Sequence, residues 1–440
     1  MTGPKEASVP SMKVCFFTLG CKVNQHETGA LQELFRQHGY TIGGDGESAD
    51  VYIVNSCTVT AAGDRKSLQW LRRAKRINPE AVTVLTGCYP QAFPEQAASA
   101  PADIIMGNTD RLALVQRVER FLQDHQAQTD IAPHCTGERF EELPAARLAG
   151  HTRAFLKVED GCNRFCAYCV IPLARGRVRS RSAQSVLEEL RTLTQQGCRE
   201  FVLSGINLSC YGADTGDDLA GLVEQAAALP GVERIRLGSL EPDLVAPQTW
   251  ERLARVPQLC PQFHLSLQSG CDATLRRMRR HYTAAEYADL TKRLRQLFDR
   301  PALTTDIIVG FPGETDADFE ESMRFVQQCR FLKVHVFSYS VRPGTAAADF
   351  PDQVAEEVKA QRSRALSEAV DAVRLQVLQE QLGTEEEVLL ERPCGDGLYT
   401  GYTRRYVPVR VAAPGHAQGD IVRVRLGSLR DGRCDAEALD

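Results

Sequence analysis

The chain lacks any long uninterrupted hydrophobic run. None of its 440 residues falls in an apolar stretch close to the roughly 18 residues that a transmembrane helix needs. The first segment, MTGPKEASVPSMK, also lacks the apolar core and cleavage site of a secretory signal. We therefore expect a cytoplasmic protein with no membrane partner, and a flexible tail over residues 1–12.

The chain has neither an even set of cysteines nor a net positive charge. It contains 15 cysteines, and without an export signal this number argues against a disulfide framework. Clustered cysteines in a reducing compartment more often bind metal or react. The net charge of −5 gives no overall preference for nucleic acid, so any such binding must come from local basic segments. The length predicts two to four domains.

Strands and helices alternate in the first part of the chain. Short apolar runs at 13–19, 50–56, 81–87 and 102–108 are separated by stretches with helical spacing. This alternation predicts a doubly wound parallel sheet in an N-terminal domain over residues 13–126. Residues 127–150 are polar with scattered Pro and Gly, which is typical of a linker.

The same alternation resumes over residues 151–378. Six strand candidates, separated by helical stretches, predict a partial (β/α)6 barrel; they lie at 153–160, 200–207, 232–240, 262–270, 303–311 and 333–340. A single long helix is expected over 354–382. Residues 379–440 are rich in short strands and predict a small antiparallel β barrel. The expected fold class is therefore α/β with a separate C-terminal barrel.

Three cysteines lie within eight positions after the first central strand. The stretch DGCNRFCAYC contains Cys162, Cys166 and Cys169 with C-x₃-C-x₂-C spacing, which matches no zinc pattern. Cysteine thiolates are the usual ligands of iron–sulfur clusters, and three of them on a four-iron cluster leave one iron open to a small molecule. Three buried core cysteines would not need this spacing. The motif therefore predicts a cluster with an open site.

A second set of three cysteines is spread over the N-terminal domain. Cys21, Cys57 and Cys88 each follow one of three successive strand candidates. The loops after such strands converge at one edge of a doubly wound sheet. We therefore expect three thiolates to meet there, again without a fourth.

The central motif resembles the cluster motif of the radical S-adenosylmethionine (SAM) superfamily. Tyr168 matches the aromatic position before the last ligand. The resemblance implies that SAM chelates the open iron and is cleaved to a 5′-deoxyadenosyl radical.

Together the two cysteine sets resemble the methylthiotransferase family over nearly the whole chain. The stretches TLGCKVNQHET, GCNRFCAYCVIPLARGRVRSR, SLQSGCD and GFPGET are most similar to the branch that modifies threonylcarbamoyladenosine in tRNA, next to the anticodon. The resemblance implies two 4Fe–4S clusters, with SAM as radical source and methyl donor. The second cluster would hold a sulfide, and the methylthio group would go to carbon 2 of the adenine.

The resemblance also implies partners. These are the tRNA anticodon stem-loop, a sulfur donor, and a low-potential electron donor such as ferredoxin or flavodoxin. The C-terminal barrel would be an RNA-binding TRAM domain.

Several polar or small residues at the ends of the central strands are candidates for SAM binding. They fall at one end of one sheet, which favours a shared mouth over unrelated tight turns. Besides Tyr168 the candidates are Gly205, Asn207, Ser239, Glu241, Gln268, Gly310 and Gly313. Glu314 either contacts SAM or caps the next helix. His335 alternates with apolar residues and is expected to be a core histidine.

Local basic segments indicate RNA. Arginines next to the central motif could contact phosphates near the reacting base, and arginines interleaved with tyrosines on a small barrel suit contact with RNA. The candidates are Arg175, Arg177, Arg179, Arg181, Arg404 and Arg405. The alternative for each is an ordinary solvated strand face.

Two alternative substrates and one alternative class of protein remain open. The same chemistry could act on isopentenyladenosine in tRNA or on an aspartate of a ribosomal protein, because these branches share the six cysteines and the barrel. A non-catalytic iron–sulfur protein that binds RNA or transfers electrons is the alternative from another class.

Overall fold

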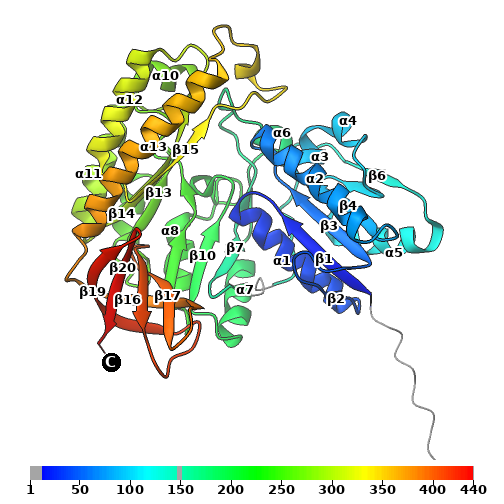
Figure 1. Ribbon diagram of the computed structural model, residues 1–440, viewed down its shortest axis with the longest axis horizontal. Helices are drawn as coiled ribbons and strands as arrows, with labels where there is room; N and C mark the ends of the chain where they lie inside the picture. The colour runs from blue at the N-terminus through cyan, green and yellow to red at the C-terminus, as the bar shows by residue number, and fades with distance from the viewer. Residues whose placement is uncertain (1–11, 146–150, 440) are drawn as a thin grey trace, which may run out of the picture. The chain divides into compact units, whose positions relative to one another are not determined.

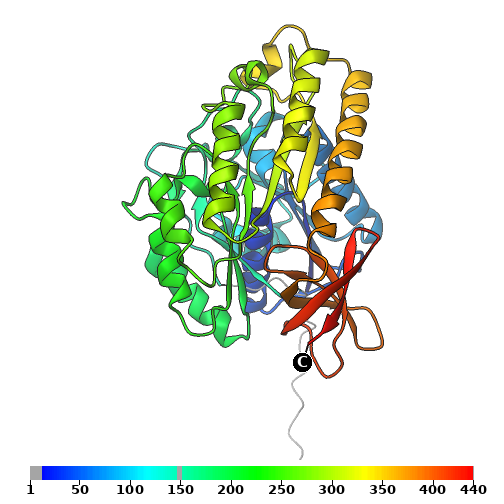
Figure 2. The same cartoon turned by 90° about the vertical axis from the view of Figure 1, so that its left-hand side faces the viewer.

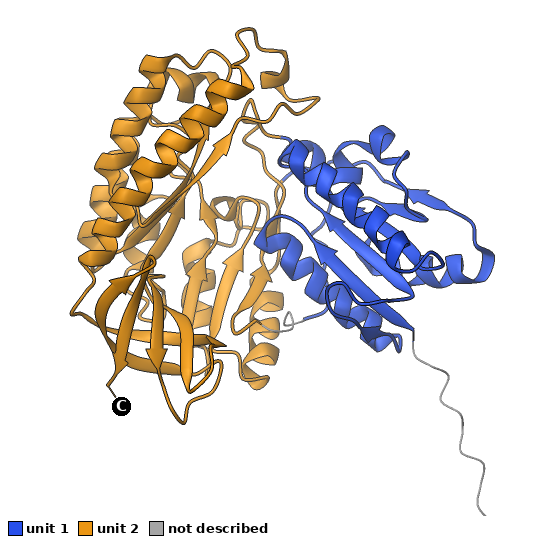
Figure 3. Ribbon diagram, viewed as in Figure 1, with its two compact units in different colours: residues 1–149, 170–177 blue, residues 150–169, 178–440 orange. Residues whose placement is uncertain are grey.

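The computed structural model describes residues 12–145 and 151–439 (Figure 1). Residues 1–11 of the expected tail and residues 146–150 of the expected linker lie outside the described residues. The chain forms two compact units, and the division is not a simple cut (Figure 3). Unit 1 comprises residues 1–149 and 170–177, and unit 2 comprises residues 150–169 and 178–440.

Unit 1 is built on a parallel six-stranded sheet of order β2-β1-β3-β4-β5-β6. This confirms the doubly wound parallel sheet, with the strand order reversing at β1 and β3. The strands are β1 (Lys13–Thr18), β2 (Thr41–Ile42), β3 (Val51–Ser56), β4 (Val82–Gly87), β5 (Ile104–Met106) and β6 (Gln128–Asp130). Strand β6 falls inside the segment that was expected to be a linker.

Helices cover both faces of this sheet. The helical elements are α1 (Lys22–Gln37), α2 (Ala61–Ile77), α3 (Cys88–Ala92), α4 (Pro94–Ala97), η1 (Arg111–Ala113), α5 (Leu114–Asp124) and α6 (Ile171–Arg175). Leu31 of α1 packs with Ile53 of β3 in one cluster, and Leu71 of α2 packs with Val54 in another. Because neighbouring strand residues point to opposite faces, β3 is apolar on both faces and buried throughout.

The central part of unit 2 contains six β/α repeats, as expected for the partial barrel. Its parallel strands form two hydrogen-bonded sheets, β11-β10-β7 and β12-β13-β14-β15. The strands are β7 (Ala154–Lys157), β10 (Glu200–Ser204), β11 (Arg234–Leu237), β12 (Ser239–Leu240), β13 (Gln262–Leu265), β14 (Ala302–Val309) and β15 (Lys333–Ser338). Two short strands, β8 (Glu159–Asp160) and β9 (Arg179–Ser180), pair antiparallel beside them.

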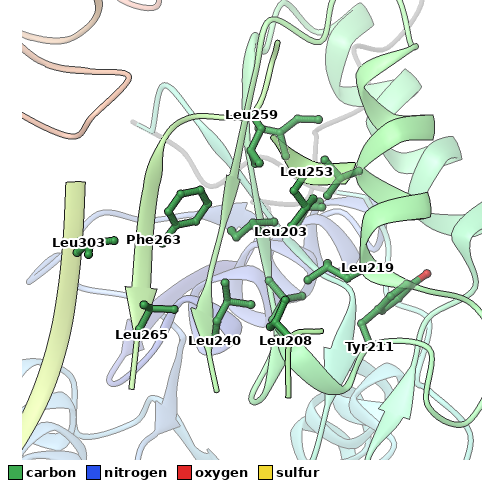
Figure 4. Packing of buried hydrophobic residues seen from close by; sticks show 14 of the residues in the cluster. Leu203, Leu208, Tyr211, Leu219, Leu240, Leu253, Leu259, Phe263, Leu265 and Leu303 are labelled. Atoms are coloured by element: carbon green, nitrogen blue, oxygen red, sulfur yellow. The ribbon is translucent and has the colours of Figure 1, made fainter. Parts of the chain in front are cut away.

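Helices line one face of these strands (Figure 2). They are α7 (Ala183–Gln195), η2 (Leu208–Cys210), α8 (Leu219–Ala227), α9 (Pro247–Leu253), α10 (Asp272–Arg277), α11 (Ala284–Leu297), α12 (Asp316–Cys329), η3 (Ala346–Asp349) and α13 (Glu356–Gln379). The apolar core between strands and helices contains Phe263, Leu265 and Leu303 from the strands with Leu219 and Leu253 from the helices (Figure 4). The remaining strand face is turned to the inside of the partial barrel.

The last strands close into the expected small barrel of order β16-β17-β18-β20-β19. They are β16 (Glu385–Pro393), β17 (Leu398–Thr403), β18 (Pro408–Ala412), β19 (Ile421–Arg430) and β20 (Arg433–Ala438). The barrel belongs to unit 2. Arg236 of β11 donates hydrogen bonds of 2.8 Å to the carbonyl groups of Thr403 and Arg404, which fix the barrel to the central strands.

Candidate cluster-binding sites

The three N-terminal cysteines lie at the carboxyl ends of three neighbouring strands of unit 1. Cys21 is the N-cap residue of α1 after β1, Cys57 follows β3, and Cys88 is the first residue of α3 after β4. Because β1, β3 and β4 are adjacent in the sheet, these loops share one edge. The structure thus brings together the three residues that the sequence analysis predicted to meet.

The three thiols influence one another, although Cys21 is exposed, Cys57 is half-buried and Cys88 is buried. Burial, with smaller contributions from the nearby Cys88 and Cys21, raises the pKa of the Cys57 thiol to about 12. Burial also raises the pKa of Cys88, where Arg175 opposes the shift and Cys21 adds to it. Gathered thiolates repel one another in such a place, and iron ions would relieve that repulsion. The donor set therefore fits a cluster held by three cysteines.

Gly20 allows the loop before α1 to approach Cys57 closely. Its φ is +104°, and a Cβ atom at this position would lie 2.7 Å from the Cβ of Cys57. No other residue would combine this backbone conformation with this contact.

A buried guanidinium contacts the same site. Arg175 of α6 is fully buried, and its Nε donates to the Sγ of Cys88 at 3.2 Å. Its other nitrogens donate to the Oε2 of Glu27 at 3.0 Å and to the Oδ1 of Asn24 at 2.7 Å. The Sγ of Cys21 lies 3.6 Å from that same Asn24 oxygen. Arg175 therefore holds a positive charge against the cysteine site.

The central cysteines lie in the loop that follows β8. The Nδ2 of Asn207 is 3.6 Å from the Sγ of Cys162, and the NH1 of Arg280 is 3.2 Å from the Sγ of Cys166. The amide of Cys169 donates to the carbonyl of Cys166 at 3.0 Å, which keeps the turn compact. Burial raises the pKa of Cys162, and Cys166 adds to the effect. The loop thus brings Cys162 and Cys166 near each other, with Cys169 in the same turn.

Arg280 plays the part here that Arg175 plays in unit 1. It is buried, forms an ion pair with Glu241, and lies 3.5 Å from the hydroxyl of Tyr168. It also donates to the carbonyl of Ser266 at 2.9 Å. Each cysteine set therefore has one thiol in contact with a buried arginine that is neutralised by a buried glutamate.

Glu159 carries a buried oxygen that lacks a partner. Its Oε2 accepts from the backbone N–H of Asn207 at 2.7 Å, whereas its Oε1 has no hydrogen-bond partner among the described residues. Burial raises the pKa of this carboxyl well above its usual range. Gly205 lies against it, since a Cβ there would be 2.5 Å from Oε2. A cationic ligand such as the SAM amino group would satisfy this oxygen.

Four of the SAM candidates gather around the central cysteines. Asn207 and Tyr168 belong to the contacts just described, Gly205 lies against Glu159, and Glu241 binds Arg280. Burial raises the pKa of Glu241, against the influence of Arg280 and Arg164. Direct contact of these residues with SAM stays a prediction.

The structure places the other candidates in strand-end turns. Ser239 is exposed on β12, and Gln268 has a φ of 70° with its amide bonded to the carbonyl of Asp306. Gly310 and Gly313 have φ values of +69° and +75° after β14. Glu314 accepts from the amide of Gly310 and pairs with Arg362, so it fixes this turn.

Four of the six candidate RNA-binding arginines pair with carboxylates, and their contact with phosphate stays a prediction. Arg175 binds Glu27, Arg179 pairs with Asp160, Arg181 pairs with Glu189, and Arg405 pairs with Glu386 and Asp299. All four are buried, because each neutralises a carboxylate inside its own unit. Arg404 donates to the carbonyl of Leu259 at 3.1 Å. Arg177 is exposed, and its contact with RNA stays a prediction.

The sequence analysis missed Arg280 and Glu159 as site residues. Arg280 lies outside the strand candidates, and Glu159 lies near the end of the strand candidate at 153–160. Glu159 precedes the first central cysteine by three positions, and a carboxylate so close to a cluster motif was the available signal. Nothing in the local sequence of Arg280 indicates that it reaches Cys166.

Comparison with known proteins agrees with this arrangement. Residues 156–326 match the Radical SAM superfamily, and residues 13–107 match a family described as uncharacterized protein family UPF0004. A radical SAM methyltransferase, TsrM from Kitasatospora setae, shares the fold with a TM-score of 0.55 at 13% identity, over 77% of this chain and 75% of its own. Fold and cysteine loops thus define a radical SAM enzyme, which uses SAM and a 4Fe–4S cluster.

Curated relatives define the family more closely. A protein of Bacillus subtilis named threonylcarbamoyladenosine tRNA methylthiotransferase MtaB is 37% identical over 94% of this chain and 93% of its own length. A protein of Pelotomaculum thermopropionicum named tRNA-2-methylthio-N(6)-dimethylallyladenosine synthase is 35% identical over 95% and 96%. The chain belongs to the radical SAM methylthiotransferase family and is an enzyme that transfers a sulfur-containing group.

The helices of the described ranges include none with the length and apolar character needed to cross a membrane.

Proposed function

We propose that this enzyme adds a methylthio group to carbon 2 of threonylcarbamoyladenosine beside the anticodon of tRNA. The observation that carries the proposal is the 37% identity, over 94% of the chain, to a relative named for that reaction. The two three-cysteine sites support it, because sulfur insertion at an aromatic carbon needs both a radical source and a place to hold sulfur.

We assign one 4Fe–4S cluster to each site. Cys162, Cys166 and Cys169 hold the cluster that binds SAM, and Cys21, Cys57 and Cys88 hold the second in the N-terminal domain. The C-terminal barrel then serves as the TRAM domain that binds the anticodon stem-loop. Its exposed arginines include Arg423 and Arg425, which both pair with the single carboxylate of Glu385. They therefore leave positive charge on the surface for RNA phosphates. We further propose a low-potential electron donor and a sulfur donor as partners, and a cytoplasmic location for the enzyme.

A reduced 4Fe–4S cluster supplies the electron that cleaves SAM. The residues of the chain prepare the place for this step. Asn207 and Arg280 donate to two of the three thiols and so fix their orientation. Glu159 offers its unpartnered oxygen to the SAM amino group. Arg175 keeps a fixed positive charge beside Cys88, which favours the thiolate form at the second site.

Nucleoside analysis tests the proposed function. Total tRNA from cells that lack the gene is digested and examined by mass spectrometry. We expect methylthio-threonylcarbamoyladenosine to disappear and threonylcarbamoyladenosine to accumulate, with other methylthio nucleosides unchanged. An unchanged tRNA profile would contradict the proposal.

A second candidate substrate is isopentenyladenosine, because the Pelotomaculum relative at 35% identity is named for the dimethylallyl nucleoside. Loss of its methylthio derivative from the same tRNA digest would favour this reaction.

A further inference from the structure

Three polar side chains stand together on three adjacent strands of unit 2. They are His264 of β13, Asp306 of β14 and His335 of β15, and one nitrogen or oxygen of each lies within 4.8 Å of the others. The Nε2 of His264 is 3.1 Å from the Oδ2 of Asp306, and its Nδ1 is 3.1 Å from the Oγ1 of Thr304. The rings of His264 and His335 lie 6.0 Å apart between centroids. His335 is thus half-buried beside two polar partners rather than in the apolar core.

The trio lies on the strand face that the helices leave uncovered. The strand neighbours Phe263, Leu265 and Ile307 belong to the core that packs against the helices. Successive strand residues point to opposite faces, so the trio points to the inside of the partial barrel. The register agrees, since Asp306 is paired with His335.

The same inner face leads to the central cysteine loop. Ser266 lies two residues beyond His264, and its carbonyl accepts from Arg280, which reaches Cys166. Two strand residues span roughly 7 Å. The trio therefore lies about 7 Å deeper in the barrel than the groups around the proposed SAM site. A purine base with its substituent is long enough to span that distance.

We propose that His264, Asp306 and His335 bind the threonylcarbamoyl substituent of the substrate and determine its selection over an isopentenyl substituent. The His335 imidazole donates to its carboxylate, and His264, whose two nitrogens bond Thr304 and Asp306, holds Asp306 in place. Asp306 orients His264 and accepts from a hydroxyl or N–H group of the substituent. This inference rests on the proposed function and identifies which residues choose the substrate.

The trio would lose hydrogen bonds to water on binding an apolar substituent. An apolar isopentenyl group would remove water from the polar atoms of the trio and offer them no hydrogen bond in return. A site built to pair with polar groups discriminates strongly against an analogue that lacks them, since its own buried groups are then left unpaired. The threonylcarbamoyl group carries a carboxylate, a hydroxyl and N–H groups, which match the donor of His335 and the acceptor of Asp306.

The test compares two RNA substrates with the reconstituted holoenzyme. Anticodon stem-loops carrying threonylcarbamoyladenosine or isopentenyladenosine are assayed for kcat and KM with the wild-type enzyme and with His335→Leu. We expect the substitution to lower kcat/KM on the first RNA by roughly 10- to 100-fold, mainly through KM, and to leave or raise the low rate on the second. His335→Gln, which keeps an N–H donor, should recover part of the loss.

A matched control is His38→Leu, which removes a histidine that pairs with Glu119 on the surface of unit 1. It should change neither rate. An equal loss on both RNAs with His335→Leu would show a structural role and overturn the inference, as would an unchanged ratio. One equivalent of a non-iron divalent metal lost from His335→Leu together with the selectivity would instead assign the trio to a metal site.

The two proposals fail in different ways. If the wild-type enzyme methylthiolates the threonylcarbamoyl RNA and the variants keep the selectivity, only the inference about the trio falls. If the wild-type enzyme acts on the isopentenyl RNA alone, the proposed substrate falls and the inference falls with it.

Discussion

Each cysteine set is accompanied by a buried guanidinium. The Cys88 thiol faces Arg175 and the Cys166 thiol faces Arg280, both at 3.2 Å. Hydrogen bonds to the sulfur ligands and the net charge nearby are among the factors that set the potential of an iron–sulfur cluster. Arg175 and Arg280 could therefore adjust the potentials of the two proposed clusters without binding iron.

Removing one thiol from each set tests whether the two sites are independent. We expect Cys88→Ala and Cys166→Ala each to lower iron and sulfide from about eight to about four per chain after anaerobic reconstitution. Colorimetric iron and sulfide determination provides the measurement. The exposed Cys135, replaced by alanine, should leave the content at about eight. A wild-type content of four would remove the second cluster from the proposal.

Replacing Arg175 exposes the charge that it neutralises. Arg175→Met leaves Glu27 buried with Arg111, at 2.8 Å, as its remaining charged partner in the described ion pairs. We expect a loss of about 2–3 kcal/mol in the unfolding free energy of unit 1, because a buried charge loses part of its compensation. Urea unfolding followed by the fluorescence of Trp70, in a Trp250→Phe background, measures it.

A double variant provides the control for that experiment. Arg175→Met with Glu27→Gln should recover part of the lost stability, because the uncompensated charge is gone. If the double variant is no more stable than Arg175→Met, the ion pair does not account for the loss.

Single residues also show where sequence reasoning ends. The convergence of Cys21, Cys57 and Cys88 could be predicted, because strand order alone brings loops together. The burial of Arg175 could not, since its partner Glu27 lies 148 positions away and the local sequence reads as a basic surface run. Long-range pairing of this kind leaves no local signal.

At the scale of the elements, the turn between β1 and α1 is the most constrained. Gly20→Ala places a Cβ 2.7 Å from the Cβ of Cys57 at a φ of +104°. Strain and overpacking together should cost unit 1 about 3 kcal/mol and impair cluster assembly. The Trp70 unfolding curve and the iron content measure both effects.

Gly39 offers a matched comparison for the turn. Its φ is +84°, but a Cβ would have no neighbour within 4 Å. Gly39→Ala should therefore cost only about 1 kcal/mol and leave the iron content unchanged. Equal losses in the two variants would mean that contact with Cys57 is unimportant.

Long periodic elements were predictable, and short ones were not. Helix α11 is one of the helical stretches expected between the central strands, and its capping box at Thr283 and Glu286 fixes its start. Strands β2 and β6 have two and three residues, too few to show a period, and were missed. They become strands because a neighbouring strand supplies the hydrogen bonds.

At the scale of the whole molecule, the barrel and the central strands of unit 2 share one buried charge network. Glu200 lies within hydrogen-bond distance of Arg236, and Arg153 binds Glu391 of the barrel. The stacked rings of Tyr402 and Tyr406 also lie beside Arg153, so these tyrosines serve the junction. We therefore expect barrel and central strands to unfold together.

Acid should weaken this junction. Burial would raise the pKa of Glu200, but Arg236, Arg153 and Arg234 outweigh it and lower the pKa to about 2. A carboxyl with a lowered pKa contributes stability above its unfolded value, near 4.5, and loses it as the pH falls towards 2. We expect about 3 kcal/mol to be lost over that range.

The fluorescence of Trp250, in a Trp70→Phe background, reports the unfolding of unit 2. Glu200→Gln should be less stable than the parent at pH 7, and the gap should close as the pH falls from about 4.5 to about 2. A gap that stays constant with pH would show that the network does not depend on the charge of Glu200.

The membership of α6 in unit 1 has a consequence for how the protein is made. Residues 1–149 do not contain Arg175, which arrives only with residues 170–177. On the ribosome, the N-terminal sheet therefore emerges before its last helix and before the guanidinium that faces Cys88. Because Arg175 follows Cys162 to Cys169 in the sequence, the three N-terminal cysteines lack this guanidinium until the central motif has been translated. If Cys21, Cys57 and Cys88 bind the proposed second cluster, their site would be completed only after the central motif has been synthesised.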